Sequence, residues 1–543
     1  MTRVMPELEQ VTDVLVVGFG AAGACAAIEA ADSGAEVLVI DRFAGGGASA
    51  LSGGVVYAGG GTPQQEQAGV NDSVQAMLDY LTQEVGDAVS QATLRRFCTE
   101  SVGMIDWLTG LGVPFEGSLC PYKTSYPSDK YYLYYSGSEL AGGFADAATP
   151  APRGHRTRGK GTSGKLLFAR LAAAVRGRGV RVLRATTATE LITDQTGRVV
   201  GARCSTLTGA PGWVRRTHHL AGRYAAKPGL YVPRLRRLLM RLVTGLEQRH
   251  ARPLRITASG GVVLAAGGFV ANRAKLREHA PAYRGGLPLG TAGDDGSGIR
   301  LGTELGAATR FLDHVSVWRF ISPPSALLTS VLVDRAGQRV CDESRYGAAL
   351  GHALVTEHDS RGWLLVDRET VRAARAQLAS ETLWFQRLQA HYLLGRGSVG
   401  GPTLDAVAAR AGIDPAGLRA TVEAHNAAAR AGTADPTGKP ARLVVPIEQP
   451  PYQLLDISIR PSLAYPCPML TLGGLVVHED SGGVRRADGA VIPGLYAAGR
   501  TAVGLCSNSY VSGLSLADCV FSGRRAGRSA AAAKVGSRHA ETG

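Results

Sequence analysis

Three glycines near the start of the sequence have the spacing of a phosphate-binding turn. The turn lies between an apolar run, 14–17, and an Ala-rich stretch, 24–31, and its G-x-G-x-x-G glycines are Gly18, Gly20 and Gly23. The first glycine permits a tight bend, the second lets the backbone approach a pyrophosphate, and the third lets helix and strand pack closely. The N–H groups that begin the helix, including those of Ala21 and Ala22, would bind the pyrophosphate. The spacing therefore predicts a dinucleotide site.

An acidic residue follows at the distance that such a site requires. Asp41 ends a second apolar run, 37–40, eighteen residues after the last glycine of the turn. There a carboxylate would accept hydrogen bonds from the adenosine ribose hydroxyls. The glycine-rich stretch 45–54 can lay its backbone against a flat ring system, with the hydroxyls of Ser49 and Ser52 facing it. A flexible linker is the alternative interpretation. The other candidate cofactor residues in this region are Arg42, Gly53 and Gly54.

A group of tyrosines is the next feature that could take part in binding or catalysis. Six lie close together in a stretch that also contains two prolines, and they are Tyr122, Tyr126, Tyr131, Tyr132, Tyr134 and Tyr135. Such side chains can line an apolar cavity while keeping their phenol hydroxyls available for hydrogen bonds. A surface loop that packs its tyrosines on the body of the protein is the alternative.

Alternating strand and helix patterns position these groups and predict an α/β protein. The Ala-rich helix lies between two short β-branched runs, and a further buried strand, 261–266, ends in paired glycines. The glycine-rich pattern stops near residue 311 and returns after 450, which indicates a second domain between these positions. The Ala-, Ser- and Lys/Arg-rich residues from 528 onward predict a disordered tail.

Composition narrows the class of protein. The 543 residues carry a formal charge of +14, and eight cysteines are dispersed without a C-x-x-C pair. We therefore expect free thiols in a reducing compartment and no metal site. The sequence shows no signal peptide and no apolar run long enough to span a bilayer, so we expect a cytoplasmic protein, with a peripheral position on the inner face of the membrane left open.

Much of the positive charge lies in an apparent insertion at 208–255. This segment has eleven basic residues and one acidic residue, Glu247, hence a net charge of +10. It also carries an apolar stripe at helical spacing, formed by Leu235, Leu238, Leu239, Leu242, Val243 and Leu246. A basic amphipathic helix suits an anionic membrane surface. The alternative is a helix that packs its stripe on the body or on a second subunit. Without a recognised binding motif, nucleic acid is not an expected partner.

Several motifs together resemble the fumarate reductase/3-ketosteroid dehydrogenase flavoprotein superfamily. They are the turn at 18–23, the strand 264–269, the loop 293–296, and the C-terminal motifs 497–499 and 512–516. The resemblance implies an α/β fold with a Rossmann-like FAD-binding domain, discontinuous in sequence, and an inserted catalytic or capping domain. The implied boundaries are 1–305 and 455–527 for the FAD-binding domain, 306–454 for the inserted domain, and 528–543 for the tail.

The resemblance also implies residues that contact FAD. Those outside the N-terminal region are Ala266, Gly267, Asp295, Gly499, Arg500, Ser515 and Leu516. The last two begin the final helix, whose positive end would face the flavin N1/O2 edge, where negative charge collects on reduction. The histidine that attaches flavin covalently in succinate dehydrogenases is missing from 45–54, so we expect FAD to be non-covalent.

The sequence departs from the dicarboxylate reductases of the superfamily. These present a histidine before the Thr-x-Gly-Gly motif and an arginine before the final Gly-Gly, whereas this chain has Met469 and Leu470 before Thr471, and Tyr510 in place of the arginine. Neutral side chains cannot replace the bidentate arginine that holds a carboxylate. A succinate or fumarate substrate is therefore not expected.

The segment 510–516 instead resembles the Tyr-x-Ser-Gly-x-Ser-Leu signature of 3-ketosteroid Δ4-(5α)-dehydrogenases. The tyrosine and first serine of that signature, Tyr510 and Ser512 here, belong to the active site of that group. The segment 343–346 resembles the one that supplies the group's other active-site tyrosine, which implies this role for Tyr346. Tyr465 lies in Tyr-Pro-Cys-Pro-Met, which keeps the tyrosine and prolines of the Δ1-dehydrogenase motif and loses both its glycines.

We therefore expect an FAD-dependent dehydrogenase that introduces a C=C bond beside the ketone of a hydrophobic 3-ketosteroid, at Δ4. Tyr510 would accept the α-proton with help from Ser512, Tyr346 would polarise the carbonyl, and Tyr134 and Tyr465 would line the cavity. The alternatives are a flavin-dependent ene-reductase or Δ1-dehydrogenase, and a membrane flavoprotein without its own substrate. The external electron acceptor is not identified by the sequence.

Overall fold

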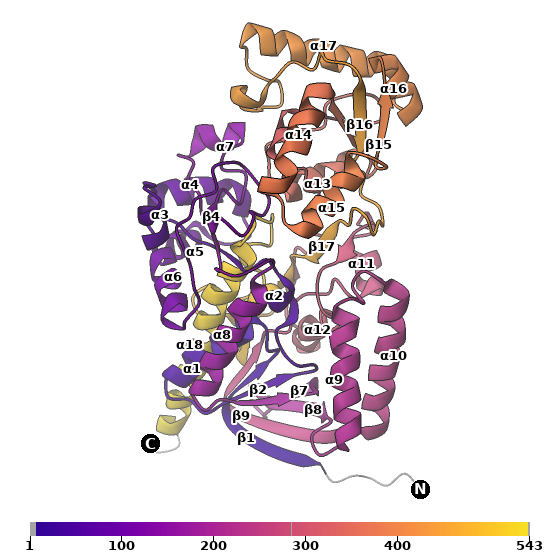
Figure 1. Cartoon of the computed structure of the whole chain (residues 1–543). Helices are drawn as coiled ribbons and strands as arrows, with labels where there is room; N and C mark the ends of the chain where they lie inside the picture. The colour runs from indigo at the N-terminus through magenta and orange to yellow at the C-terminus, as the bar shows by residue number, and fades with distance from the viewer. Residues whose placement is uncertain (1–6, 284, 541–543) are drawn as a thin grey trace.

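The computed structural model of the protein describes residues 7–283 and 285–540. Figure 1 shows an elongated molecule, with a large sheet containing β1, β2 and β9 at one end and the helices α14, α16 and α17 at the other. The long helix α18 runs beside α1, so helices from opposite parts of the sequence lie in the same layer.

The largest sheet in the described residues has eight strands, in the order β19-β20-β9-β1-β2-β6, with β8 added to β9 and β7 to β8. The strands are β1 (Leu8–Val17), β2 (Val37–Asp41), β6 (Arg181–Arg184), β7 (Thr186–Thr193), β8 (Val199–Thr206), β9 (Arg252–Leu264), β19 (Gly483–Arg485) and β20 (Val491–Ala497). The five strands β20, β9, β1, β2 and β6 are parallel to one another, whereas β19 and β8 pair antiparallel with β20 and β9. The predicted α/β fold class is confirmed.

Both faces of this sheet are covered. Along β1, Val14 and Val16 pack with the helices α1 (Ala21–Asp32) and α18 (Leu514–Ala540). The alternate side chains, Leu15 and Val17, pack with the β7–β8 hairpin instead. This burial on two faces explains the unbroken run of apolar residues in the sequence.

Helix α18 replaces the disordered tail expected from residue 528, since it continues to Ala540, and residues 541–543 lie outside the described part of the chain. Ala530 and Ala531 are buried in the same core as α1. Arg528 pairs with Glu29 of α1 at 3.0 Å. Alanine has the highest helix propensity, so a composition that resembles a flexible tail forms a helix once one face is buried.

The remaining elements of the cofactor-side region form small sheets and helices around the large sheet. The strands are β3 (Val55–Tyr57), β4 (Leu133–Tyr134), β5 (Gly154–Arg156), β10 (Leu287–Pro288), β11 (Thr309–Arg310), β12 (Val315–Val317), β17 (Pro468–Thr471) and β18 (Gly474–Leu475). The helices are α2 (Gly47–Leu51), α3 (Pro63–Gln67), α4 (Val74–Val85), α5 (Gln91–Thr99), α6 (Ser101–Gly110), α7 (Gly142–Ala147), α8 (Gly164–Gly177), α11 (Arg273–His279) and α12 (Ser297–Thr303).

The other end of the molecule, called the cap here, comprises residues 319–459 and is built on a separate antiparallel sheet. Its strands, in spatial order, are β13 (Val331–Val333), β14 (Trp363–Val366), β16 (Tyr452–Asp456) and β15 (Ser398–Gly401). Its helices are α13 (Gly347–Glu357), α14 (Arg368–Glu381), α15 (Trp384–Leu393), α16 (Leu404–Ala411) and α17 (Pro415–Ala431). The boundary expected between 454 and 455 falls inside β16, because this strand completes the cap sheet.

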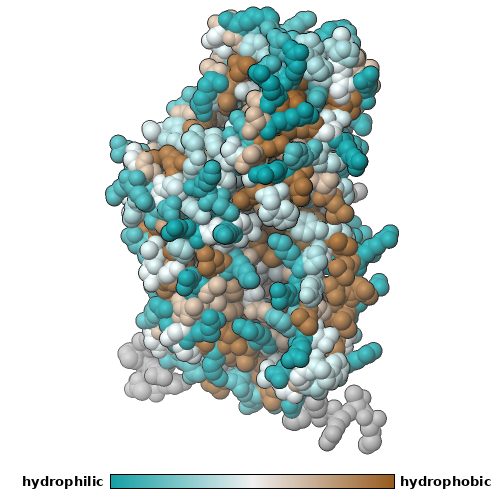
Figure 2. All heavy atoms as spheres, viewed as in Figure 1, coloured by the Kyte–Doolittle hydropathy of each residue, from teal (hydrophilic) through white to brown (hydrophobic). Residues whose placement is uncertain are grey.

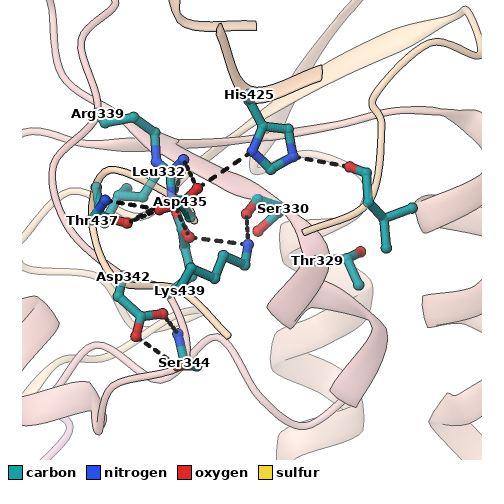
Figure 3. Close-up of polar contacts among 12 residues, drawn as sticks. Thr329, Ser330, Leu332, Arg339, Asp342, Ser344, His425, Asp435, Thr437 and Lys439 are labelled. Atoms are coloured by element: carbon teal, nitrogen blue, oxygen red, sulfur yellow. Dashed lines mark hydrogen bonds and ion pairs between the residues drawn. The ribbon is translucent and has the colours of Figure 1, made fainter. Parts of the chain in front are cut away.

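A buried ionic cluster ties the cap together (Figure 3). Glu343 accepts hydrogen bonds from the Leu332 N–H at 2.6 Å and from Arg339 at 2.9 Å, and it pairs with Lys439 at 3.0 Å. Arg339 also pairs with Asp435 at 3.0 Å. Since these carboxylates and the ammonium are fully buried, each charge depends on its partners. The cluster fixes the segment that leads from Glu343 towards Tyr346.

The predicted insertion contains two helices instead of one. Helix α9 (Gly212–Ala226) and helix α10 (Pro233–His250) pack side by side (Figure 1). The predicted leucine stripe divides between two faces: Val243 and Leu246 are buried, whereas Leu238 and Leu242 are exposed. Within the described residues, no helix has both the length and the apolar character needed to cross a membrane.

Candidate active site

A cleft with about 1270 Å³ of empty space, part of it open solvent, lies at the carboxyl ends of β1, β2 and β9. Most of the residues predicted to contact a dinucleotide line it. They are Gly18, Gly20, Ala21, Ala22, Asp41, Arg42, Ser49, Ser52, Ala266, Gly267, Asp295, Arg500, Ser515 and Leu516. This is the position at which parallel α/β sheets bind ligands, because loops and helix N-termini converge there.

Four predicted cofactor residues lie outside the lining and pack around it. They are Gly23, Gly53, Gly54 and Gly499. A Cβ atom at Gly23 would overlap the Gly18 carbonyl, and one at Gly53 would overlap the ring of Tyr126. These glycines allow close packing behind the cleft, because a side chain there would overlap neighbouring atoms.

The glycine turn has the geometry of an anion-binding site. Gly18 has a φ of +105°, and a Cβ there would overlap the Ala265 carbonyl. Gly20, which precedes α1, faces open space, with the Ser49 hydroxyl as the nearest atom at 3.7 Å from a Cβ position. That hydroxyl accepts a hydrogen bond from the Ala21 N–H at 3.1 Å. The Ala21 N–H is therefore already engaged, and a phosphate at the positive end of α1 would lie beside the Ser49 hydroxyl.

Asp41 is held by the backbone at the end of β2. Its two carboxylate oxygens accept hydrogen bonds from the N–H groups of Phe19 at 2.9 Å and Phe43 at 2.7 Å. Burial raises the pKa of this carboxyl, against the lowering effect of these hydrogen bonds. Each carboxylate oxygen has a second lone pair for a ribose hydroxyl. The neighbouring Arg42 also lines the cleft, and its guanidinium pairs with Glu247 at 2.8 Å and with Asp295 at 3.4 Å.

An arginine at the opposite wall has an unused donor. Arg500 pairs through Nη2 with Asp294 at 2.6 Å, whereas its Nη1 is buried without a hydrogen-bond partner. A buried donor of this kind is costly unless a ligand accepts its hydrogen bond. The N-terminus of α18 lies beside it, because Ser515 and Leu516 also line the cleft. The site therefore fits a dinucleotide whose phosphates lie at α1 and whose ring system lies near α18.

Tyr510 lies in the wall of the cleft among other aromatic rings. Its ring centroid is 4.8 Å from that of Trp318 and 6.3 Å from that of Tyr346. Tyr346 precedes α13 and lines a second, smaller cavity together with Lys123 and Ser322. Burial raises the pKa of both phenols, Tyr510 and Tyr346. Both hydroxyl groups are therefore protonated at neutral pH.

Ser512 connects two phenols from different parts of the chain. Its hydroxyl lies 3.2 Å from the Tyr134 hydroxyl. Ser512 also lowers the pKa of the Tyr346 phenol, against the larger effect of burial, which raises it. Tyr465, by contrast, does not line the cleft. Its hydroxyl donates to the Phe320 carbonyl, and the Arg319 guanidinium covers its ring at 4.4 Å. In this structure Tyr465 supports the cap segment.

A chain of buried side chains links the two segments that carry Tyr346 and Tyr510. The Tyr346 N–H donates to the Ser138 hydroxyl at 3.1 Å, and the Ser138 N–H donates to the Tyr80 hydroxyl at 2.8 Å. Tyr80 donates to Glu84 at 2.8 Å, and Glu84 accepts from the Ser509 hydroxyl at 2.6 Å. Ser509 directly precedes Tyr510. This chain holds the two phenols in a fixed relation across the cap boundary.

Several lining residues were not identified from the sequence. They are Phe19, Phe43, Thr186, Thr187, Ala188, Leu289, Thr291, Asp294, Ser297, Trp318, Leu470 and Cys519. Trp318 is the aromatic neighbour of Tyr510, and its position just after β12 in an apolar segment carries no signal of function. Asp294 could have been identified from the sequence, because it lies in the same 293–296 loop as the predicted Asp295.

Comparisons with known proteins agree with this geometry. The model of the FAD binding domain family matches residues 13–515. The 3-oxo-5-alpha-steroid 4-dehydrogenase of Comamonas testosteroni is 38% identical over 90% of this chain and 92% of its own. The cytochrome-containing fumarate reductase of Shewanella frigidimarina is 22% identical over 96% of this chain and 77% of its own.

A solved structure extends the similarity to almost the whole chain. The crystal structure of 3-ketosteroid-delta4-(5alpha)-dehydrogenase from Rhodococcus jostii RHA1, in complex with 4-androstene-3,17-dione, superposes with a TM-score of 0.80. It is 31% identical and covers 98% of this chain and 99% of that one. The chain therefore belongs to the FAD-binding fumarate reductase/3-ketosteroid dehydrogenase superfamily and is a 3-ketosteroid dehydrogenase-like, FAD-dependent oxidoreductase.

Proposed function

We propose that the protein introduces the Δ4 double bond into a hydrophobic 3-ketosteroid. The observation that carries this proposal is the set of neutral hydroxyl groups, Tyr510, Tyr346, Ser512 and Tyr134, gathered where the cleft meets the cap. The two similar dehydrogenases named above act at Δ4, which favours this position over Δ1. Bound FAD supplies the acceptor for the β-hydride at its N5 atom.

The residues of the site supply a hydrogen-bond donor for the substrate carbonyl and a path for the α-proton. Tyr510 faces the cleft with a raised pKa, so its phenol suits donation of a hydrogen bond to the substrate carbonyl. Ser512 and Tyr346 suit acceptance of the α-proton. The Ser512 hydroxyl lies 3.2 Å from that of Tyr134, so a proton taken at Ser512 can be passed to Tyr134, and Ser512 also lowers the pKa of the Tyr346 phenol. A polarised carbonyl makes that α-proton more acidic.

This assignment exchanges the roles expected from the family signature. There, Tyr510 was the acceptor and Tyr346 the carbonyl partner, with Ser512 assisting Tyr510. A phenol with a raised pKa accepts a proton only if it can release its own. Ser512 lies 3.2 Å from the Tyr134 hydroxyl and lowers the pKa of Tyr346, which favours Ser512 and Tyr346 as the acceptor pair.

Flavin reduction by a panel of ketosteroids tests the proposal. We expect a saturated 5α-3-ketosteroid to bleach the flavin absorbance of the purified holoprotein, with the Δ4-enone as the product in mass and NMR spectra. A 1-ene product would instead identify a Δ1-dehydrogenase. Bleaching by none of the saturated ketones, together with consumption of enones by the reduced flavin, would contradict the proposal and support an ene-reductase.

The Ser512→Ala variant separates the proton path from binding. We expect it to retain FAD and to bind ketosteroid while losing turnover by a factor of about 100 or more, the usual contribution of a positioned proton acceptor. Unchanged turnover in this variant would exclude the proposed acceptor pair.

A further inference from the structure

The outer face of α9 and α10, called the basic hairpin here (residues 212–250), exposes large apolar side chains. Trp213 is 60% exposed and Leu238 is 63% exposed. The others are Leu220, Tyr224, Tyr231, Val232 and Leu242. Figure 2 shows apolar residues in brown among hydrophilic residues in teal on the flank where Figure 1 places α10. A concentration of exposed apolar residues on one supersecondary unit marks an interaction surface.

The same face carries positive charge. Its exposed basic residues are Arg215, Arg216, Arg223, Lys227, Arg234, Arg237, Arg241 and Arg249, and none of them forms an ion pair with a residue that the structure describes. The hairpin's single acid, Glu247, is already engaged, since it pairs with Arg42 at 2.8 Å and with His218 at 3.0 Å. Nothing on the hairpin therefore offsets the charge of its outer face.

Apolar and basic residues alternate at helical spacing on both helices. On α9, Trp213, Leu220 and Tyr224 recur at steps of seven and four. On α10, Leu238 and Leu242 lie four apart. The helices are antiparallel, since the ring of Trp213, at the start of α9, contacts His250 at the end of α10 with centroids 5.5 Å apart. Exposed stripes of the two helices thus form one amphipathic surface.

We propose that the basic hairpin binds the surface of an anionic lipid bilayer, with its leucines and aromatic rings inserted at the headgroup boundary and its arginines paired with lipid phosphates. The combination of Trp, Tyr and Leu with Arg is the composition of helices that lie in a membrane interface. A second copy of the chain fits this face less well. A two-fold dimer would bring the same patch of each copy together, and arginines would then face arginines.

Sedimentation of the full-length holoprotein with vesicles tests the proposal. We expect binding to phosphatidylcholine vesicles that contain phosphatidylglycerol, weak binding to phosphatidylcholine alone, and a decrease in binding as salt is raised. The Leu238→Ser/Leu242→Ser variant and the Arg234→Gln/Arg237→Gln/Arg241→Gln variant should each bind the anionic vesicles at least about tenfold more weakly. Both should keep their FAD and their turnover of a dissolved ketosteroid.

A matched control is available on the cap. Trp384 and Leu388 of α15 are 73% and 62% exposed, so Trp384→Ser/Leu388→Ser removes a similar apolar area elsewhere and should bind vesicles like the wild type. Equal binding to both kinds of vesicle, or equal losses in the control and hairpin variants, would overturn the proposal. A hairpin-dependent dimer that does not bind vesicles would assign the face to a second copy. Binding of DNA by the protein, without binding of vesicles, would assign the outer face of the hairpin to nucleic acid.

Discussion

The Tyr510→Phe substitution is the sharpest test of the proposed chemistry, because it removes one hydroxyl and leaves the ring. The Tyr510 ring is partly buried in an aromatic environment, with Trp318 at 4.8 Å and Tyr346 at 6.3 Å between ring centroids. In such surroundings a hydrogen bond to a carbonyl that gains negative charge is worth more than in water. Loss of one donor of this kind costs about 100- to 1000-fold in kcat, or about 3–4 kcal/mol.

The expected result is a fall in kcat with a smaller change in KM, because the hydrogen bond strengthens as charge develops on the oxygen. Anaerobic stopped-flow measurement of flavin reduction would give the rate of the chemical step directly. Since burial raises the pKa of Tyr510, its ionisation should not produce a loss of wild-type activity between pH 7 and its ordinary pKa of about 10. Tyr452→Phe, in β16 of the cap, is the matched control, and it should keep the wild-type activity in the steady-state and the stopped-flow assays. Full flavin reduction rates in Tyr510→Phe would refute the assigned role.

Two further predictions concern stability. Asp518 is buried in α18, and burial raises its pKa from 3.8 to about 6. This pKa lies above that of Asp518 in the unfolded chain. The contribution of Asp518 to stability is therefore present below pH 4 and is lost as the pH rises through 6. Asp518→Asn should therefore raise the free energy of unfolding by about 3 kcal/mol above pH 7 and leave it unchanged below pH 4, as measured by urea denaturation; a gain that is equal at both pH values would contradict this. Lys439→Met should lower the free energy of unfolding by about 3 kcal/mol, since it leaves the buried Glu343 with Arg339 as its remaining cationic partner; an unchanged denaturation midpoint would show that the cluster in Figure 3 does not stabilise the cap.

The sequence predicted those parts of the site whose chemistry depends on short, local patterns. The glycine turn, Asp41, and the start of the last helix were identified because each follows an apolar strand or opens a helix, and the structure brings them to one cleft. Backbone N–H groups and carboxylates act through such local geometry. The predicted assignments of individual catalytic roles remain predictions.

Contacts across the chain could not be predicted in the same way. Trp318, the link from Ser138 to Ser509, and the pairing of Arg500 with Asp294 each join residues distant in sequence, and no periodic pattern records them. The tail was misjudged for a related reason. Its alanines appear as low-complexity sequence until α1 provides a surface on which they are buried. The basic insertion was recognised by charge, whereas its division into two helices depended on the break between Ala226 and Pro233.

The packing of α18 on α1 also bears on how the protein is made. Glycines of α18 allow this contact, since a Cβ at Gly523 would crowd the Ala22 carbonyl and one at Gly527 would overlap that of Ala26. The two walls of the nucleotide cleft are therefore translated almost 500 residues apart. A nascent chain on the ribosome cannot complete the cleft until α18 has emerged, so we expect flavin loading to follow the emergence of this helix. Chains truncated before Leu514 should accordingly purify without yellow colour.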